Sequence, residues 1–209
     1  MATEQLYSAL KMVDELRIYC GASDKIYTLI CDKIATGLET YAVQLSDGGI
    51  KHIVHGWTNN REKIIGSIRD SDGKTRYSVN SYSFWVLSGM LDRGTVPKND
   101  ILYAYDKLDS KYGLRTFTPY FPSAMTEAGR IRTITPGTYE NGATYVHAAM
   151  FAVMALFKAN EPQKAWEQIF KTIPFTHDYL TKTPFVMPNS YCINAEYGID
   201  GESLGDWYT

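Results

Sequence analysis

The sequence predicts an all-α protein built from three antiparallel helical hairpins. Apolar residues recur at helical spacing in six segments, and turn residues separate these segments. In each of the later two hairpins a strongly apolar helix precedes a more amphipathic one. Because a helix that is apolar on all sides must be surrounded by protein, this alternation favours inner helices wrapped by outer ones. Three hairpins cannot close such a ring by themselves.

The first hairpin is predicted from two patterns near the start of the chain. Apolar residues recur at helical spacing from Leu6 to Leu16, and the first helix is expected to end at Gly21. Ser23 is interpreted as the N-cap of a second helix, whose apolar stripe runs from Ile26 to Tyr41. From 45 to 79 the helical period is lost, so short β-hairpins are expected as insertions.

The second and third hairpins follow. A helix is predicted at 81–91, and a more amphipathic one from Pro97 to about Tyr112. The third hairpin is expected to pair an apolar helix at 144–158 with a helix that begins near Pro162. In that last helix we expect an inward face, and the rest of the chain, from 174 on, is expected to be mostly irregular. The inward residues are Ala165, Ile169 and Phe170.

A loop rich in Pro, Gly and Thr, at 116–142, separates these two hairpins. It is far longer than a connection requires, and such loops are usually functional or disordered.

Composition excludes several classes of protein. The 209 residues are 44% hydrophobic and 21% charged, as in ordinary globular domains. The formal net charge is −2, with basic and acidic residues interspersed, so nucleic acid is not an expected partner. The longest apolar run, 145–157, is too short to span a bilayer, and charges interrupt the start of the chain where a signal peptide would be apolar.

The cysteines and acidic residues suggest neither a disulfide framework nor a metal site. The three cysteines fit no zinc spacing, which favours a reducing, cytoplasmic location. Acidic residues at 200, 202 and 206 lack the ligand spacing of a calcium loop. Other titratable groups are interpreted as structural. His52 and His55 are expected to be exposed, and His177 to cap a short helix. The carboxylates read as solvated charges are Asp14, Asp32, Asp70 and Asp106.

The densest group of chemically useful residues lies at 135–150. Glu140 and Asn141 stand on a turn flanked by glycines, seven residues before His147 in the first turn of an apolar helix. The N-terminus of a helix favours anions, and an imidazole there can supply a further donor, so phosphate would suit this position. The simpler alternative is a buried His147 that binds a neighbouring carbonyl, with Glu140 as a cap or surface charge.

These residues, in context, resemble a known family. The segments RDSDGK (69–74), NSYSFWVLSGM (80–90), PGTYENGATYVHAAM (136–150) and DGESLGDWYT (200–209) resemble the inverting disaccharide phosphorylases, that is cellobiose phosphorylase and its relatives in glycoside hydrolase family 94. The resemblance covers essentially the whole chain. Since the catalytic domain of this family is a barrel of six helical hairpins, it implies that residues 1–209 are about half of an (α/α)6 barrel.

The resemblance also implies roles for individual residues. It places His147 and Thr209 on phosphate, with Thr209 matching the threonine of the family's Trp-(aromatic or Leu)-Thr-Gly segment. It places Glu140 among the groups that bind sugar hydroxyls. Tyr139 stands where cellobiose-specific members have Lys, so the sugar is expected to differ from cellobiose. Asn189 falls near a family glutamine that contacts ligand.

The implied reaction is phosphorolysis of a β-linked glucoside to a sugar 1-phosphate, with inorganic phosphate as co-substrate and no cofactor. Phosphate is already nucleophilic, so a phosphate cradle can replace the second carboxylate of an inverting glycosidase, but a general acid is still needed. In the family this acid is the Asp of a Trp-Asn-Asp type segment, which this sequence does not contain. The sequence also stops before the glycine that follows Thr209 in the family. The isolated chain is therefore expected to be inactive.

Two alternatives remain at this point. The chain could be a catalytically inactive carbohydrate-binding or interaction fragment, for instance a homodimer in which two half barrels complete a ring. A helical-barrel hydrolase would need two inward carboxylates, and the sequence offers no convincing pair. In every case a half barrel exposes a large apolar face, so we expect self-association or a contact with the missing half of the barrel.

Overall fold

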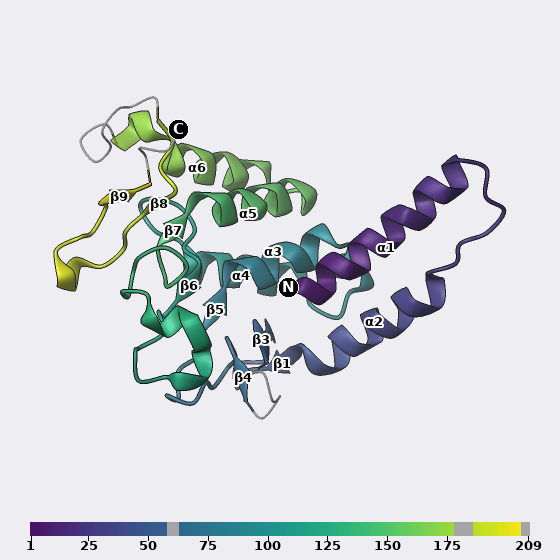
Figure 1. Ribbon diagram of the computed structural model, residues 1–209, viewed down its shortest axis with the longest axis horizontal. Coiled ribbons are helices and arrows are strands. Elements are labelled where there is room, and N and C mark those ends of the chain that lie inside the picture. The colour runs from purple at the N-terminus through teal and green to yellow at the C-terminus, as the bar shows by residue number, and fades with distance from the viewer. Residues whose placement is uncertain (58–62, 178–185, 206–209) are drawn as a thin grey trace.

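The computed structural model describes residues 1–57, 63–177 and 186–205. Within these residues the fold is mostly helical, with small β insertions, as the sequence predicts (Figure 1). The six α-helices are α1 (Ala2–Tyr19), α2 (Thr28–Tyr41), α3 (Val79–Leu87), α4 (Lys98–Leu108), α5 (Val146–Lys158) and α6 (Pro162–Thr172). Short 3-10 helices lie at Met90–Arg93 (η1), Thr126–Thr133 (η2), Pro174–His177 (η3) and Ala195–Tyr197 (η4).

The core lies between the two most apolar helices. α3 packs against α5, and α5 packs against α6. Tyr82, Trp85 and Val86 of α3 are buried, as are Ala152 and Leu156 of α5. α4 contacts α3 and is amphipathic, with its buried face toward the core. The order of an apolar helix followed by a more polar one therefore places α3 and α5 side by side at the centre.

Within the described ranges the strands are short and form four small antiparallel sheets. β1 (Val43–Leu45) pairs with β2 (Lys51–Ile53), and β3 (Gly56–Trp57) pairs with β4 (Ile64–Ile65), which confirms hairpins in this region. The other two sheets join distant parts of the chain: β5 (Tyr77–Ser78) with β6 (Phe117–Thr118), and β7 (Thr144–Tyr145) with β8 (Ser190–Tyr191) and β9 (Ser203–Leu204). The described part of the chain after 174 is mostly irregular, as expected, but β8 and β9 join it to β7 through backbone pairing.

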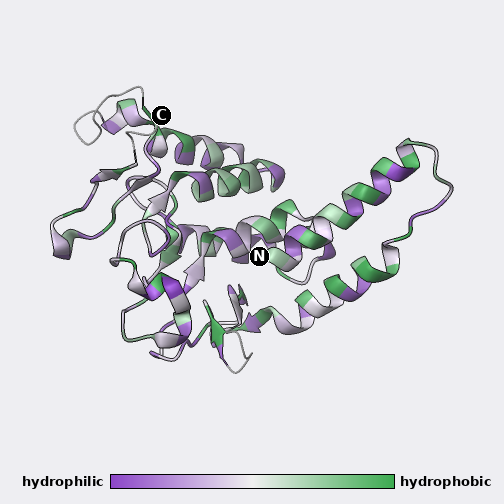
Figure 2. Ribbon diagram, viewed as in Figure 1, coloured by the Kyte–Doolittle hydropathy of each residue, from purple (hydrophilic) through white to green (hydrophobic). Residues whose placement is uncertain are grey.

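The first hairpin, α1 and α2, extends away from the rest of the molecule, with its connecting loop at the far tip (Figure 1). Apolar bands are visible along both helices in Figure 2. Many large apolar side chains of this hairpin are exposed, including Leu16 at 60% and Leu29 at 76%. The residues are Leu6, Met12, Val13, Leu16, Ile18, Tyr19, Ile26, Leu29, Ile30 and Tyr41. Most of the apolar stripe read from the sequence is therefore uncovered.

The start of α2 is set by Asp14 rather than by Ser23. The Asp14 carboxylate is buried and accepts hydrogen bonds from the backbone N–H groups of Ile26 and Tyr27, both at 3.0 Å. Tyr27 is the N-cap of α2, so the helix begins later than the sequence indicates. The interpretation of Asp14 as a solvated charge is wrong, because a cross-helix contact uses it as a cap.

Other helix boundaries also differ. α3 ends at Leu87, and the last predicted turn is the separate η1 helix after Gly89, which has a positive φ of 85°. α4 ends at Leu108. α5 begins at Val146 because Thr144 and Tyr145 are paired with β8.

Several side chains lie in environments that the sequence did not indicate. Asp70 is 2% exposed and paired with Arg76, so it is not a solvated charge. His52 is buried between the Gly66 carbonyl and the Tyr82 hydroxyl, and His55 is partly buried, so neither is freely exposed. Phe170 was expected to face inward but is 55% exposed, whereas Ala165 is buried. The burial of His52 arises from a contact between distant segments, whereas the partners of Asp70 lie within six residues of it.

His177 does contribute to a helix end. Its Nε2 donates a 2.7 Å hydrogen bond to the carbonyl of Lys171, in the last turn of α6.

Candidate functional site

An open cavity of about 490 Å³ lies beside the N-terminal halves of α3 and α5. Its apolar walls come from both helices, from β6 and from the η2 segment. They include Phe84, Phe117, Ile131, Ile134, Ala148 and Phe151. Such a concave, mainly apolar cavity with a few polar groups is the usual form of a small-molecule site.

The polar side chains of the cavity come from separate segments of the chain. They are Gln5, His55, Asn80, Thr116, Arg130, Glu140, Tyr145 and His147. Glu140 and His147, which the sequence singled out, therefore line the same cavity.

His147 is the second residue of α5 and its side chain is exposed to the cavity. Its ring lies 4.8 Å from that of Phe151, centroid to centroid, one turn further along the helix. The start of α5 is fixed because the Val146 N–H donates to the Asn189 carbonyl at 2.9 Å. The alternative of a buried His147 bonded to a neighbouring carbonyl is contradicted by this exposure.

Glu140 is held by a compact turn. The backbone N–H of Gly137 donates to the Asn141 carbonyl at 2.7 Å, and Thr138 and Asn141 form an isolated β-bridge across the turn. Gly137 has φ of 78°, and a Cβ there would collide with the Ile193 carbonyl, so only glycine fits. The turn leaves the Glu140 carboxylate exposed at the cavity, where it can accept hydrogen bonds from hydroxyl groups.

Tyr139 and Asn189 lie nearby but are not among the residues that line the cavity. Tyr139 has φ of 41° and is 39% exposed, and its carbonyl accepts a hydrogen bond from Thr116 Oγ1. Asn189 is exposed, and its backbone pairs with Val146 on one side and Leu204 on the other. Thr209 lies outside the described residues.

Sequence reasoning did not identify six polar residues of the cavity: Gln5, His55, Asn80, Thr116, Arg130 and Tyr145. The imidazole of His55 bonds Ser78 Oγ through Nδ1 at 3.0 Å and packs edge-on against Phe117. Burial, with a smaller contribution from the positively charged amino terminus, lowers the pKa of His55 to about 4, so the ring is neutral at pH 7. Thr116 Oγ1 accepts from the Gly142 N–H at 2.9 Å and is thus occupied.

Asn80 is different, because its Oδ1 is buried and has no hydrogen-bond partner within the described part of the chain. Asn80 belongs to the segment NSYSFWVLSGM that carried the family resemblance, and this was the only signal available for it.

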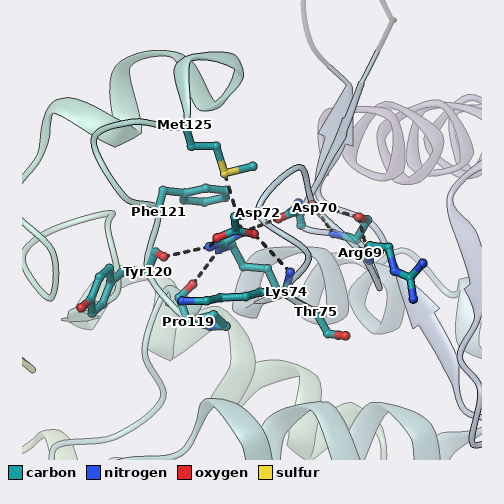
Figure 3. Close-up of polar contacts among 12 residues, drawn as sticks. Arg69, Asp70, Asp72, Lys74, Thr75, Pro119, Tyr120, Phe121 and Met125 are labelled. Atoms are coloured by element: carbon teal, nitrogen blue, oxygen red, sulfur yellow. Dashed lines mark hydrogen bonds and ion pairs between the residues drawn. The ribbon is translucent and has the colours of Figure 1, made fainter.

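A buried charge cluster holds the segment that runs from Phe117, which lines the cavity, to Phe121. The Arg76 guanidinium is fully buried and pairs with Asp70 at 2.7 Å and Asp72 at 2.8 Å. It also donates to the carbonyls of Pro119 and Tyr120, and the Phe121 ring lies 4.5 Å away (Figure 3). The hydrogen bonds from Arg76 lower the pKa of Asp72. The hairpin before α3 is thereby tied to the loop after β6.

Two further properties concern the described residues only. No three or more His, Cys, Asp or Glu side chains gather there in a way that could hold a metal ion. None of the described helices has the length and apolar character needed to cross a membrane.

Comparison with known proteins gives one family. The profile described as "Glycosyl hydrolase 94 superfamily, catalytic domain" matches residues 1–209.

Curated relatives are similar at modest identity. The 3-O-beta-D-glucopyranosyl-beta-D-glucuronide phosphorylase of Paenibacillus borealis is 32% identical over 131 residues, which cover 61% of this chain and 16% of the relative. Solabiose phosphorylase of the same organism is 28% identical over 156 residues, 72% of this chain and 20% of the relative. N,N'-diacetylchitobiose phosphorylase of Vibrio furnissii is 28% identical over 193 residues, 90% of this chain and 23% of the relative. The chain thus spans about a fifth of the length of these relatives.

Proposed function

Because the chain belongs to the catalytic-domain family of the glycosyl hydrolase 94 superfamily, we propose that it is part of an inverting glycoside phosphorylase. In this proposal a β-linked glucoside reacts with inorganic phosphate to give a sugar 1-phosphate and a shortened acceptor, and residues 1–209 are part of an (α/α)6 barrel. The names of the relatives, which include phosphorylases of a glucosyl glucuronide and of diacetylchitobiose, support the reaction class.

The observation that carries the proposal is that Glu140 and His147 line one cavity. His147 would donate a hydrogen bond to phosphate, close to the positive end of α5, while Glu140 would accept from sugar hydroxyls. A phosphate oxygen then attacks the anomeric carbon, the bond to the leaving oxygen breaks, and that oxygen takes a proton from a general acid. We assign the general acid to no residue of this chain, so phosphorolysis would require a Trp-Asn-Asp type segment from elsewhere.

Substitution of His147 tests the assignment. In a completed barrel, His147→Ala is expected to raise the phosphate concentration needed for half-maximal rate by ten-fold or more, because a charge-assisted hydrogen bond contributes about 1.5–3 kcal/mol. Initial rates across a phosphate series measure this. Met154→Ala, at an exposed position of the same helix, is the control and should behave as the unmodified protein. An unchanged phosphate dependence in His147→Ala would remove the assignment.

A second candidate is sugar binding without turnover. It is favoured by one observation: Glu140 is the only carboxylate among the described residues that line the cavity. Calorimetry with glucosides and with phosphate on the 209-residue chain, together with an assay for sugar 1-phosphate, separates the two candidates. Sugar binding with no product supports the second one.

We also propose that protein covers the apolar face of α1 and α2 in the functional assembly, through self-association or through the missing half of the barrel. The exposed residues of this hairpin support the proposal.

A cytoplasmic location is supported by three cysteines that are all free.

A further inference from the structure

Arg130 is the one guanidinium among the described residues that line the cavity, and the proposed function does not use it. Its side chain is exposed and makes no ion pair or side-chain hydrogen bond within the described ranges. Glu140 lines the same cavity, yet no ion pair joins the two.

The backbone around Arg130 is fixed. Ala128 and Ile131 pack with Phe117, Phe121 and Met125 in a small apolar cluster. Gly129, with φ of 63° and ψ of −137°, breaks the η2 helix immediately before Arg130 and redirects the chain. Thr133 Oγ1 donates to the Arg130 carbonyl at 2.8 Å. A cavity-lining cation is therefore carried on an anchored segment.

Two of the other polar groups of the cavity already have hydrogen-bond partners within the protein. Thr116 is occupied by backbone groups, and His55 is bonded to Ser78. The Oδ1 of Asn80 has no partner in the described part of the chain, and as an acceptor it suits a ligand hydroxyl rather than an anion. A guanidinium is permanently charged, and its planar donors match the two oxygens of a carboxylate or a phosphate.

We propose that Arg130 is a second oxyanion contact of the cavity, separate from His147, and that it binds either phosphate or the carboxylate of a sugar ligand. The inference rests on the proposed function only in taking this cavity as the ligand site. The two sources of the oxyanion share the same chemistry at the guanidinium, and experiment distinguishes them.

The test is calorimetry on the 209-residue chain at low ionic strength, with inorganic phosphate, glucuronate and glucose as separate ligands. Arg130→Gln is expected to lose ten-fold or more in affinity for at least one of the two oxyanions and to bind glucose unchanged. Loss for phosphate identifies phosphate as the ligand of Arg130, and loss for glucuronate identifies a sugar acid.

Arg132→Gln is the matched control. Arg132 lies two residues away, does not line the cavity, and donates through Nη1 to the Ser123 carbonyl at 2.8 Å. The inference is overturned if Arg130→Gln binds both oxyanions as well as the unmodified chain does. It is also overturned if Arg132→Gln loses as much affinity, or if the unmodified chain binds neither oxyanion.

His147→Asn separates this inference from the proposed function. If His147→Asn loses phosphate while Arg130→Gln changes nothing, the inference fails and the proposed function stands. If His147→Asn binds phosphate normally while Arg130→Gln loses an oxyanion, the phosphate role of His147 fails and the inference stands. Thermal melting of both variants checks that each is folded.

Discussion

The side chain of Asn141 connects two separate stretches of backbone, one of which carries the cavity residue Ile134. Its Oδ1 accepts from the Phe121 N–H at 2.7 Å, and its Nδ2 donates to the carbonyls of Phe121 and Ile134, both at 3.0 Å. The residue is fully buried, so it satisfies backbone groups that water cannot reach. In the Glu-Asn-Gly turn, Glu140 therefore lines the cavity. Asn141 fixes the backbone of Ile134, which lines the same cavity.

His55 makes stability depend on pH. Its pKa in the folded protein is about 4, against about 6.5 when unfolded, so between these values the unfolded chain binds more protons. The free energy of unfolding should therefore fall as pH drops from about 6.5 to about 4, by up to about 3 kcal/mol. Burial lowers the pKa of His52 as well, with the same sign.

Urea unfolding at several pH values measures this effect. His55→Asn, which keeps a polar group near the Ser78 hydroxyl but cannot titrate, should show a shallower fall over the same range. Identical pH profiles for the two proteins would mean that His55 does not carry the effect.

The site residues were only partly predictable from sequence. Glu140 and His147 lie on one turn and the helix that follows it, so a local pattern indicates that they act together. Asn80 and Arg130 reach the cavity from α3 and η2, and only tertiary packing brings them there. The burial of His52 likewise depends on Tyr82, a hydrogen-bond partner thirty residues away that no local pattern reveals.

Helices were better predicted than their ends. The apolar periodicity located all six α-helices, because burial of one face governs where a helix forms. The ends depended on other segments. α5 begins two residues late because β8 pairs with Thr144 and Tyr145, and α2 begins late because Asp14 of α1 caps it. Strands of two or three residues carry too little pattern to be located individually.

Asp14 is expected to determine the stability of the first hairpin. Asp14→Ala removes the acceptor of two N–H groups at the start of α2, which should lower the free energy of unfolding by roughly 1–3 kcal/mol. Denaturant unfolding followed by far-UV circular dichroism measures the loss. Asp32→Ala, at an exposed position of α2, serves as control and should change little. Equal stability of the two variants would contradict a capping role for Asp14.

The exposure of apolar side chains differs between parts of the molecule. α3 and α5 are enclosed, whereas the hairpin of α1 and α2 extends from them (Figure 1). Many large apolar side chains of this hairpin are exposed. Soluble monomers rarely leave contiguous apolar surfaces of this kind uncovered.

The 209-residue chain is therefore expected to self-associate. Sedimentation velocity at rising concentration should show species larger than a monomer. Leu16→Lys combined with Leu29→Lys should shift the distribution toward monomer, because both side chains are exposed on this face. Tyr197→Lys adds a charge at an exposed position of η4 and should have no such effect. A monodisperse monomer at all concentrations in the unmodified chain would rule out this expectation.

The sheet of β7, β8 and β9 has a practical implication for inhibition. Ile193 N–H donates to the Gly137 carbonyl beside the Glu140 turn, and Asn189 accepts from Val146 beside His147. One stretch of backbone thus supports the segments that carry both proposed ligand contacts. A peptide or small molecule that displaced this stretch would disable the two contacts together without ever entering the pocket they face.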